Sequence, residues 1–368
     1  MRRRWFHRSC LLALLGLAVG VFAEPAEVRE PDEVDPSTQP DEIRRGMRMG
    51  DPPQERYRRY WESLGRRIEP TLQGDWARFD QYLEFFQREI VRDQRLFSFA
   101  ADLSVDEAGG RVVRVRAEYR EQAEAFARLL DVLGLTAHHD VRLIPEPGSG
   151  AGGGLGMVRA ADADAPRRGF LRAQPDAKSE AVNEALPGEP VWLLSTDNAT
   201  NARWLLCHST DGYLGWIAAE AVERIEPDRF NAAVNARPAS HAARVDAAIA
   251  DAERRLGRPY VWGGRGEEGV DCSGLVQQAF ASQGVHLPRD AEQQALVGRL
   301  VATRWHREPM RRGDVMFFLG RRGFVAHTAI YLGDGKLIES ADGKVRVSDF
   351  HPGLPRWENF CFAKRVLE

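Results

Sequence analysis

Cysteine is scarce in this chain, which has four among 368 residues: Cys10, Cys207, Cys272 and Cys361. Neither Cys-x-x-Cys nor His-x-x-x-His spacing occurs, so the sequence lacks the common zinc-ligand patterns. We therefore expect no metal and no cofactor. A basic excess is also missing, because 51 Lys and Arg face 54 Asp and Glu, a formal net charge of -3. A dedicated nucleic-acid binder normally carries a basic surplus, and we expect no nucleic-acid partner.

The apolar run at the N-terminus is short. It extends from Cys10 to Phe22, between a segment with four arginines and the small residue Ala23. A membrane-spanning helix needs about 20 apolar residues, so we interpret 1–23 as a signal peptide cleaved near Ala23 rather than as a membrane anchor. We expect an exported chain, periplasmic or secreted, without stable membrane insertion. Cleavage leaves three cysteines, an odd number that excludes complete pairing within one molecule.

Composition and periodicity divide the rest of the chain into five segments. The first is rich in Pro, Glu, Asp and Arg and has little apolar surface to bury, and the third is rich in glycine. The segments are a disordered leader (24–50), an N-terminal α+β domain of unknown role (51–145), a Gly-rich linker (146–156), a small β domain (157–228) and a C-terminal domain (240–368).

The N-terminal domain shows a clear alternation of helix and strand signals but no catalytic constellation. The pattern is helical from about 55 to 95, with apolar residues at three- and four-residue steps over 76–90. Strands over 96–104 and 111–119, a helix over 120–135 and a strand over 139–144 follow. His138 and His139 resemble a metal pair, but neighbours on a strand point to opposite faces, and we expect a surface loop there.

Short strands and turns dominate 157–228 and predict a small antiparallel barrel. LRAQPDAKSEAVNEALPGEPVWLL, followed by WLLCHSTDGYLGWIAAEAV, resembles a bacterial SH3-type barrel, a module frequent in cell-wall proteins. The anchors of this resemblance are Gly188-Glu189, Trp204, Asp211-Gly212-Tyr213 and Gly215-Trp216. An unrelated small β domain is the alternative.

Cys272 differs from Cys207 and Cys361, which lie in apolar strand-like runs where cysteine is usually buried. The pattern of 273–280 places its apolar residues on one helical face, so Cys272 lies in the first turn of a helix with Asp271 as a natural N-cap. A helix N-terminus favours the reactive thiolate, whereas the charge of Asp271 opposes it. Asp271 therefore either caps the helix or binds something else.

A nucleophilic cysteine needs a base, and His327 is the best candidate. His286 and His306 lie in turn or loop segments and are expected at the surface. His327 lies in the first strand of a hairpin that turns at 333–335. If 332–334 form the loop, 331 faces 335 and 327 faces 339. That register places Glu339 beside His327, and a one-residue slip would turn Glu339 to the opposite face. An exposed His–Glu surface pair is the alternative.

Several motifs in fixed order carry a second resemblance. PYVWGG, DCSGLVQQAF, GVHLPRDAEQQ, MRRGDVMFF and HTAIYLGDGKLIES closely resemble the NlpC family of cell-wall cysteine peptidases over about residues 240–368. The resemblance implies an α+β multidomain protein in which the SH3-like barrel precedes a papain-like α+β peptidase domain. It also implies Cys272 as nucleophile, His327 as general base and later general acid, and Glu339 as the third, orienting residue, where the family most often has His.

The resemblance also assigns roles to neighbouring residues. Tyr260 matches the active-site tyrosine beside the oxyanion site, Asp271 the position that binds an L-Ala ammonium group, and Ser273 a contact to the D-Glu carboxylate. Glu180 and Tyr213 match the acidic and phenolic barrel residues that close the site.

One position departs from the family pattern. Ala291 stands where the family often has Ser, so a hydroxyl that would help to hold the substrate carboxylate is absent. We expect Arg289 or a backbone N–H to compensate.

The implied function is a cysteine endopeptidase whose partners are peptidoglycan stem peptides. Members with an SH3-type barrel cleave the bond between γ-D-Glu and the following diamino acid in peptides with a free N-terminal L-Ala. An amidase or transacylase on the same fold is one alternative. A non-catalytic cell-wall-binding protein is another.

Overall fold

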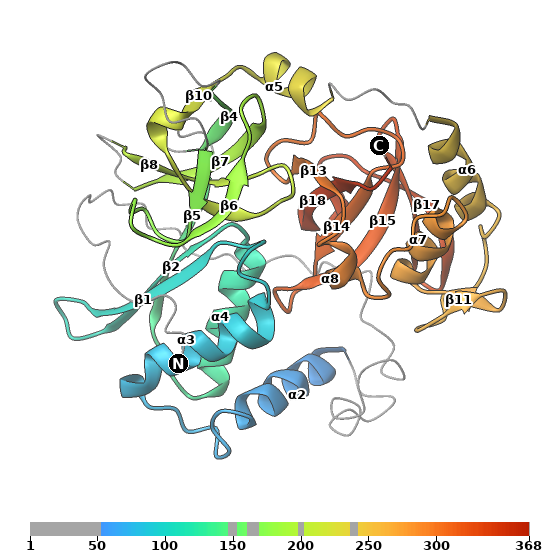
Figure 1. Ribbon diagram of the computed structural model, residues 1–368. Coiled ribbons are helices and arrows are strands. Elements are labelled where there is room, and N and C mark those ends of the chain that lie inside the picture. Colours follow the sequence, from blue (N-terminus) through green and yellow to red (C-terminus); the bar gives the residue numbers. More distant parts are fainter. Residues whose placement is uncertain (1–52, 146–152, 160–168, 198–201, 236–241, 368) are drawn as a thin grey trace.

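The structure is a computed structural model that describes residues 53–145, 153–159, 169–197, 202–235 and 242–367. The expected signal peptide, the expected leader and most of the expected linker lie outside the described residues. Three units are visible along the chain (Figure 1). None of the helices in the described ranges is long and apolar enough to cross a membrane.

The N-terminal unit packs helices against a three-stranded sheet of order β1-β2-β3, in which β1 and β2 are antiparallel and β2 and β3 parallel. The predicted sequence of elements is confirmed, but the helix expected over 76–90 is a succession of 3-10, α and π turns. His138 and His139 open strand β3 and do not lie in a loop. The elements are α2 (Pro53–Arg66), η2 (Trp76–Arg78), α3 (Phe79–Phe86), η3 (Gln87–Val91), β1 (Phe99–Val105), β2 (Arg111–Ala117), α4 (Arg120–Val132) and β3 (His138–Leu143).

The second unit is a seven-stranded antiparallel sheet of order β10-β4-β7-β8-β9-β5-β6. Its apolar interior is a separate core cluster that includes the buried thiol of Cys207. Strand β4 begins at Gly154, so this sheet takes in three residues of the expected linker. The elements are β4 (Gly154–Val158), β5 (Gly169–Arg172), β6 (Ala181–Ala185), β7 (Pro190–Thr196), β8 (Trp204–His208), β9 (Leu214–Ala218), η4 (Ala219–Ala221) and β10 (Val222–Arg224).

The C-terminal unit is a six-stranded antiparallel sheet of order β13-β18-β14-β15-β16-β17, with helix α7 packed against β15 and β16. Figure 1 shows α7 and α6 on the side of the sheet away from the barrel. Helix α5 (Pro227–Val234) follows the barrel and packs against β4 and β7. The elements of the C-terminal unit are α6 (Ala242–Glu253), β11 (Arg265–Gly266), β12 (Gly269–Val270), α7 (Cys272–Ala281), α8 (Ala291–Gln294), β13 (Arg299–Thr303), β14 (Val315–Leu319), β15 (Val325–Gly333), β16 (Lys336–Ala341), β17 (Lys344–Asp349), α9 (Pro355–Asn359) and β18 (Phe360–Arg365).

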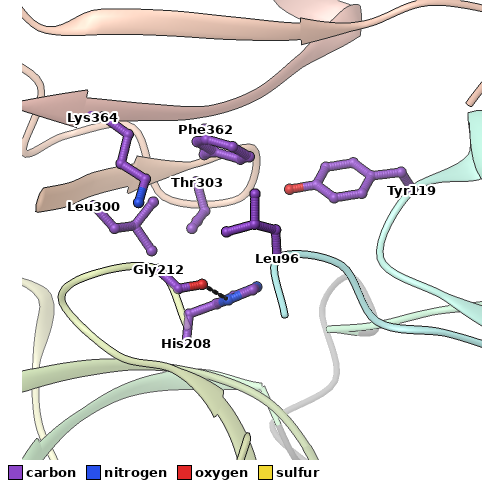
Figure 2. Close-up of a pocket in the computed structure, with 8 residues that line it drawn as sticks. All are labelled: Leu96, Tyr119, His208, Gly212, Leu300, Thr303, Phe362 and Lys364. Carbon is purple, nitrogen blue, oxygen red and sulfur yellow. Dashed lines mark hydrogen bonds between the residues drawn. The ribbon is translucent and has the colours of Figure 1, made fainter. Parts of the chain in front are cut away.

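All three units meet at one buried junction (Figure 2). Glu118 of the N-terminal unit lies 2.9 Å from Nε2 of His208 in the barrel, and both side chains are buried. Lys364 of the C-terminal sheet is fully buried and donates to the backbone oxygen of Asp211. The pocket there is lined by Leu96, Tyr119, His208, Gly212, Leu300, Thr303, Phe362 and Lys364. The units are therefore joined by buried polar contacts and not only by linkers.

Candidate active site

Cys272 is the first residue of α7, as predicted. Asp271 is the N-cap, with φ -87 and ψ -177, and its Oδ1 accepts from the backbone N–H of Gly274 at 2.7 Å. The apolar face of α7 is buried against the sheet, and this packing fixes the orientation of the helix. The Cys272 thiol is free and buried at the positive end of the helix dipole, where a thiolate is stabilised.

The glycine-rich run before Cys272 packs closely on the start of α7. A Cβ on Gly274 would collide with the carbonyl oxygen of Gly264, so only glycine allows this approach. The backbone N–H of Gly263 donates to Oδ2 of Asp271 at 2.8 Å. The glycine-rich run therefore holds the N-cap residue Asp271 in place by close packing and a backbone hydrogen bond.

His327 and Glu339 lie on the neighbouring strands β15 and β16. Nε2 of His327 is 2.8 Å from Oε2 of Glu339, and the side chains are 3% and 0% exposed. The alternative of an exposed surface pair is thus excluded. Since Nε2 is bonded to a carboxylate, proton exchange with a thiol falls to Nδ1, the other ring nitrogen.

The predicted register of this hairpin was wrong by two residues. Ile330 pairs with Ile338 and Tyr331 with Leu337, because the turn is tighter than expected and a bulge follows Tyr331. A shift of two residues preserves the face on which a side chain points, whereas a shift of one would not. Glu339 therefore still lies on the same face as His327, as a diagonal neighbour.

Glu339 remains ionised in spite of its burial. Burial raises the pKa of this carboxyl, but the hydrogen bond from His327 and the charge of Arg356 outweigh it and hold the pKa well below its usual range. Ser348 donates to Oε1 at 2.6 Å. Sequence reasoning missed these partners, although Arg346 and Ser348 alternate along β17 and Arg346 pairs directly with Glu339.

Asp271, Ser273 and Arg289 form a second cluster at the start of α7. Arg289 donates to both carboxylate oxygens of Asp271, at 3.0 and 2.5 Å, and to Oγ of Ser273 at 2.9 Å. Burial lowers the pKa of Arg289, but the Asp271 hydrogen bond outweighs burial and raises it, and Cys272 contributes in the same direction. The capping role predicted for Asp271 is confirmed, and Arg289 neutralises the charge that seemed ill matched to a thiolate.

Tyr260 lies on the segment beside Cys272. Its backbone N–H donates to the carbonyl of Gly343 at 2.8 Å, and it bridges to Val270, which directly precedes the N-cap. Its side chain is half-buried. The structure thus brings the phenol and the thiol onto paired backbone segments.

The two barrel residues lie close to one another. Glu180 is exposed just before β6, and Tyr213 is half-buried between β8 and β9. Burial raises the pKa of Tyr213, and the nearby Glu180 carboxylate adds to the increase. Within the described residues neither side chain hydrogen-bonds or ion-pairs with Cys272 or Asp271. Tyr213 instead neighbours Asp93 and Arg95 of the N-terminal unit.

Two other histidines of the C-terminal unit differ in burial. His286 is exposed, as expected, but His306 is buried, with Nε2 2.8 Å from Asn231 and its ring against Phe230. The prediction of a surface His306 was wrong because α5 folds back over that loop. No group of three or more His, Cys, Asp and Glu side chains in the described ranges could hold a metal ion.

Curated relatives are similar to about a third of this chain. "Probable endopeptidase YafL" of Escherichia coli is 39% identical over 126 residues, which are 33% of this chain and 50% of the relative. "Gamma-D-glutamyl-L-lysine dipeptidyl-peptidase" of Bacillus cereus is 35% identical over 115 residues, 30% of this chain and 33% of the relative. The chain thus spans half or less of the length of these relatives.

A solved structure of the peptidoglycan hydrolase RipB from Mycobacterium tuberculosis is 31% identical and covers 37% of this chain and 72% of its own, with a TM-score of 0.30. Structures of the Resuscitation Promoting Factor Interacting protein RipA are 30% identical and cover 36% of this chain and 66% of their own, with a TM-score of 0.30.

Two family matches agree with the two C-terminal units of the structure. Residues 171–222 match the bacterial dipeptidyl-peptidase SH3 domain, and residues 257–364 match the NlpC/P60 family. The first range lies within the seven-stranded sheet, and the second contains Cys272, His327 and Glu339. The chain therefore carries a domain of the NlpC/P60 peptidase family, preceded by a bacterial dipeptidyl-peptidase SH3 domain.

Proposed function

We propose that this chain is an exported cysteine endopeptidase that hydrolyses the bond between γ-D-Glu and the following diamino acid in peptidoglycan stem peptides. The observation that carries the proposal is the buried His327–Glu339 pair on strands packed against the helix that Cys272 begins. A nucleophile, a base and an orienting carboxylate are the minimum set for cysteine-based acyl transfer.

The reaction runs in two acyl-transfer steps. His327 Nδ1 takes the thiol proton, and Sγ of Cys272 attacks the γ-glutamyl carbonyl carbon, whose oxygen becomes an oxyanion near the N-terminal backbone of α7. The imidazolium then protonates the amine of the diamino acid, the C–N bond breaks and a thioester remains. Water, deprotonated by His327, hydrolyses the thioester and releases L-Ala-D-Glu with the thiol restored.

Charge around the thiol supports this sequence of steps. Glu339 is ionised and accepts from His327, so it stabilises the imidazolium that forms in the first step. Arg289 lies near Cys272, and its positive charge acts on the negative thiolate that forms in the same step. Both features favour a thiolate–imidazolium pair over a neutral pair.

Recognition of a free N-terminal L-Ala is a separate part of the proposal. Asp271, Glu180 and Tyr213 would face the ammonium group, and Ser273 with Arg289 would hold the D-Glu carboxylate. Contact between Arg289 and Ser273 supports the second half, because it places a cation beside the assigned hydroxyl. Asp271 already accepts from two backbone N–H groups and from Arg289, so we assign it the weaker share of ammonium binding.

The test is to incubate the protein with L-Ala-γ-D-Glu-diaminopimelate and follow the release of L-Ala-D-Glu by mass spectrometry. Cys272→Ala is the matched inactive control. Release by the wild type and none by the variant is expected. No release by the folded wild type would contradict the peptidase assignment.

The ammonium part is tested with the N-acetylated peptide. Acetylation removes the positive charge and adds bulk, so kcat/KM should fall at least about tenfold if a charged pair is lost. Equal cleavage of both peptides would refute recognition of the free amine while leaving the peptidase assignment intact.

A further inference from the structure

The carboxylate of Glu339 is held by more groups than a triad requires. It is fully buried, and His327 takes only one of its bonds. Nε of Arg356 lies 2.7 Å from Oε2, the same oxygen that bonds His327. Arg346 approaches Oε1 with Nε at 3.3 Å and Nη2 at 3.2 Å, beside Ser348 at 2.6 Å.

Arg356 is unusual because it is itself buried. Its side chain is 8% exposed, whereas that of Arg346 is 32% exposed. Arginine is almost never buried unless it is paired, so the burial of this guanidinium on the short helix α9 indicates that it has a partner. The partner is the shared Oε2 atom, and Phe318 lies 5.4 Å from the guanidinium and 5.5 Å from the His327 ring. Arg356 and His327 thus share both an oxygen and an aromatic neighbour.

The shared oxygen gives Arg356 two opposing effects. A buried carboxylate without a cation would take up a proton and lose its hold on His327. A buried carboxylate whose charge acted on His327 alone would stabilise the imidazolium so strongly that proton return to the leaving amine would be impeded. A guanidinium on the same oxygen keeps the carboxylate ionised and takes up part of its charge.

We propose that Arg356 is a positioning residue that sets the proton affinity of His327 through the Oε2 atom of Glu339. The inference rests on the proposed roles of Cys272 and His327 as nucleophile and base, and not on the identity of the peptide bond that is cut. Arg346 has a lesser share, because it is more exposed, bonds the other oxygen at longer distance and also pairs with Asp342 at 2.5 Å.

Other charged groups lie on the elements that pack against β15, and they are unchanged in the variants of Arg356. On the α7 side they are Cys272 and Asp271, with Arg289 paired to Asp271. On α8, Glu292 pairs with Arg92 of the N-terminal unit. At the start of β14, buried Asp314 pairs with Arg365. Arg356 differs from all of these because it contacts the carboxylate that contacts the base.

The experiment measures the rate of alkylation of Cys272 by iodoacetamide against pH, followed by intact mass, and needs no peptide substrate. The wild type should show two steps, one as the thiolate forms beside the imidazolium and one as the imidazolium loses its proton. Arg356→Gln removes the competing cation from Oε2. The second step should then move to higher pH by about one unit, while the first stays within a few tenths.

Conservative variants separate this effect from simple packing. Arg356→Lys keeps a cation and should return the second step toward the wild-type pH, and Arg346→Gln should move it by less than half as much as Arg356→Gln. Intact wild-type pH steps in Arg356→Gln, or a step moved to lower pH, would overturn the proposal. Should Arg356→Gln not fold, Arg346→Gln decides it: the second step should still move to higher pH by a few tenths of a unit, and an unmoved or lowered step would overturn the premise that a cation on Glu339 lowers the proton affinity of His327.

Discussion

Two buried His–Glu pairs differ in their surroundings, one at the candidate active site and one at the junction of the three units. The distance between His327 Nε2 and Glu339 Oε2 is 2.8 Å, and that between His208 Nε2 and Glu118 Oε1 is 2.9 Å. Nδ1 of His208 lies 3.0 Å from the carbonyl oxygen of Gly212, so each ring nitrogen of His208 meets an atom that can only accept (Figure 2). That ring is locked between two units, whereas the ring of His327 is oriented by one nitrogen for chemistry at the other.

The carboxylates of the two pairs also differ in their support. Glu339 keeps Arg356, Arg346 and Ser348 as partners when its histidine is removed. The second oxygen of Glu118 accepts from the backbone N–H of Ser98 at 2.7 Å, and its charge partner is His208. Loss of the histidine should therefore abolish activity at one pair and weaken folding at the other.

The largest effect is expected for His327→Gln. Without a base, kcat/KM on the stem peptide should fall about 10⁴-fold, as for removal of a triad member. The free energy of unfolding should change by about 1 kcal/mol or less, because the arginines still neutralise Glu339. Peptide cleavage and urea unfolding measure the two quantities. A large loss of stability with residual activity would remove the contrast between the pairs.

The opposite result, a loss of stability with little change in activity, is expected for His208→Leu. Removing one partner of a buried ion pair costs about 3–5 kcal/mol of unfolding free energy, whereas kcat/KM of the folded protein should stay within about twofold. The double variant Glu118→Leu with His208→Leu should be more stable than the single, since no buried charge is stranded. A double variant less stable than the single would show that the pair does more than neutralise itself.

The contact between His327 and Glu339 could be predicted from the sequence, but that between His208 and Glu118 could not, because the second pair is far apart along the chain. His327 and Glu339 are close in sequence and belong to one hairpin, where the period of two fixes a shared face even when the register is two residues off. Glu118 and His208 are 90 residues apart on different units, and no periodicity relates them. His306 was misplaced for the same reason, because its cover comes from Phe230 on another element.

The arginines of the candidate site also could not be predicted from local sequence. Asp271 as N-cap follows from local sequence, and it is confirmed. Its pairing with Arg289 depends on how the loop before α8 folds back on α7, and Arg356 arrives from α9, a helix of five residues without a strong pattern. Local pattern therefore predicted where Cys272, His327 and Glu339 lie, whereas the groups that balance their charges required tertiary structure.

Arg289→Ala tests whether the active-site cation also binds substrate. Loss of a charge-assisted hydrogen bond to the D-Glu carboxylate should raise KM about 10- to 100-fold. Arg289→Lys, which keeps the charge but not the two-pronged geometry, should fall between the two. Initial rates against peptide concentration give KM, and urea unfolding checks that the N-cap survives. An unchanged KM in Arg289→Ala would refute compensation for Ala291.

The smallest effect is expected for Lys364, the buried cation at the junction, which we compare with Arg289 at the candidate site. Burial lowers its pKa from 10.5 to about 8, since it contacts backbone carbonyls where Arg289 has a carboxylate. Between these two pH values the unfolded chain binds more protons than the folded one, so this lysine makes stability rise with pH, by at most about 1.4 kcal/mol per unit. Lys364→Met lacks the titration. Urea unfolding from about pH 7.5 to 10 should show the wild type gaining stability relative to Lys364→Met, and parallel curves would mean that Lys364 keeps its proton in the fold.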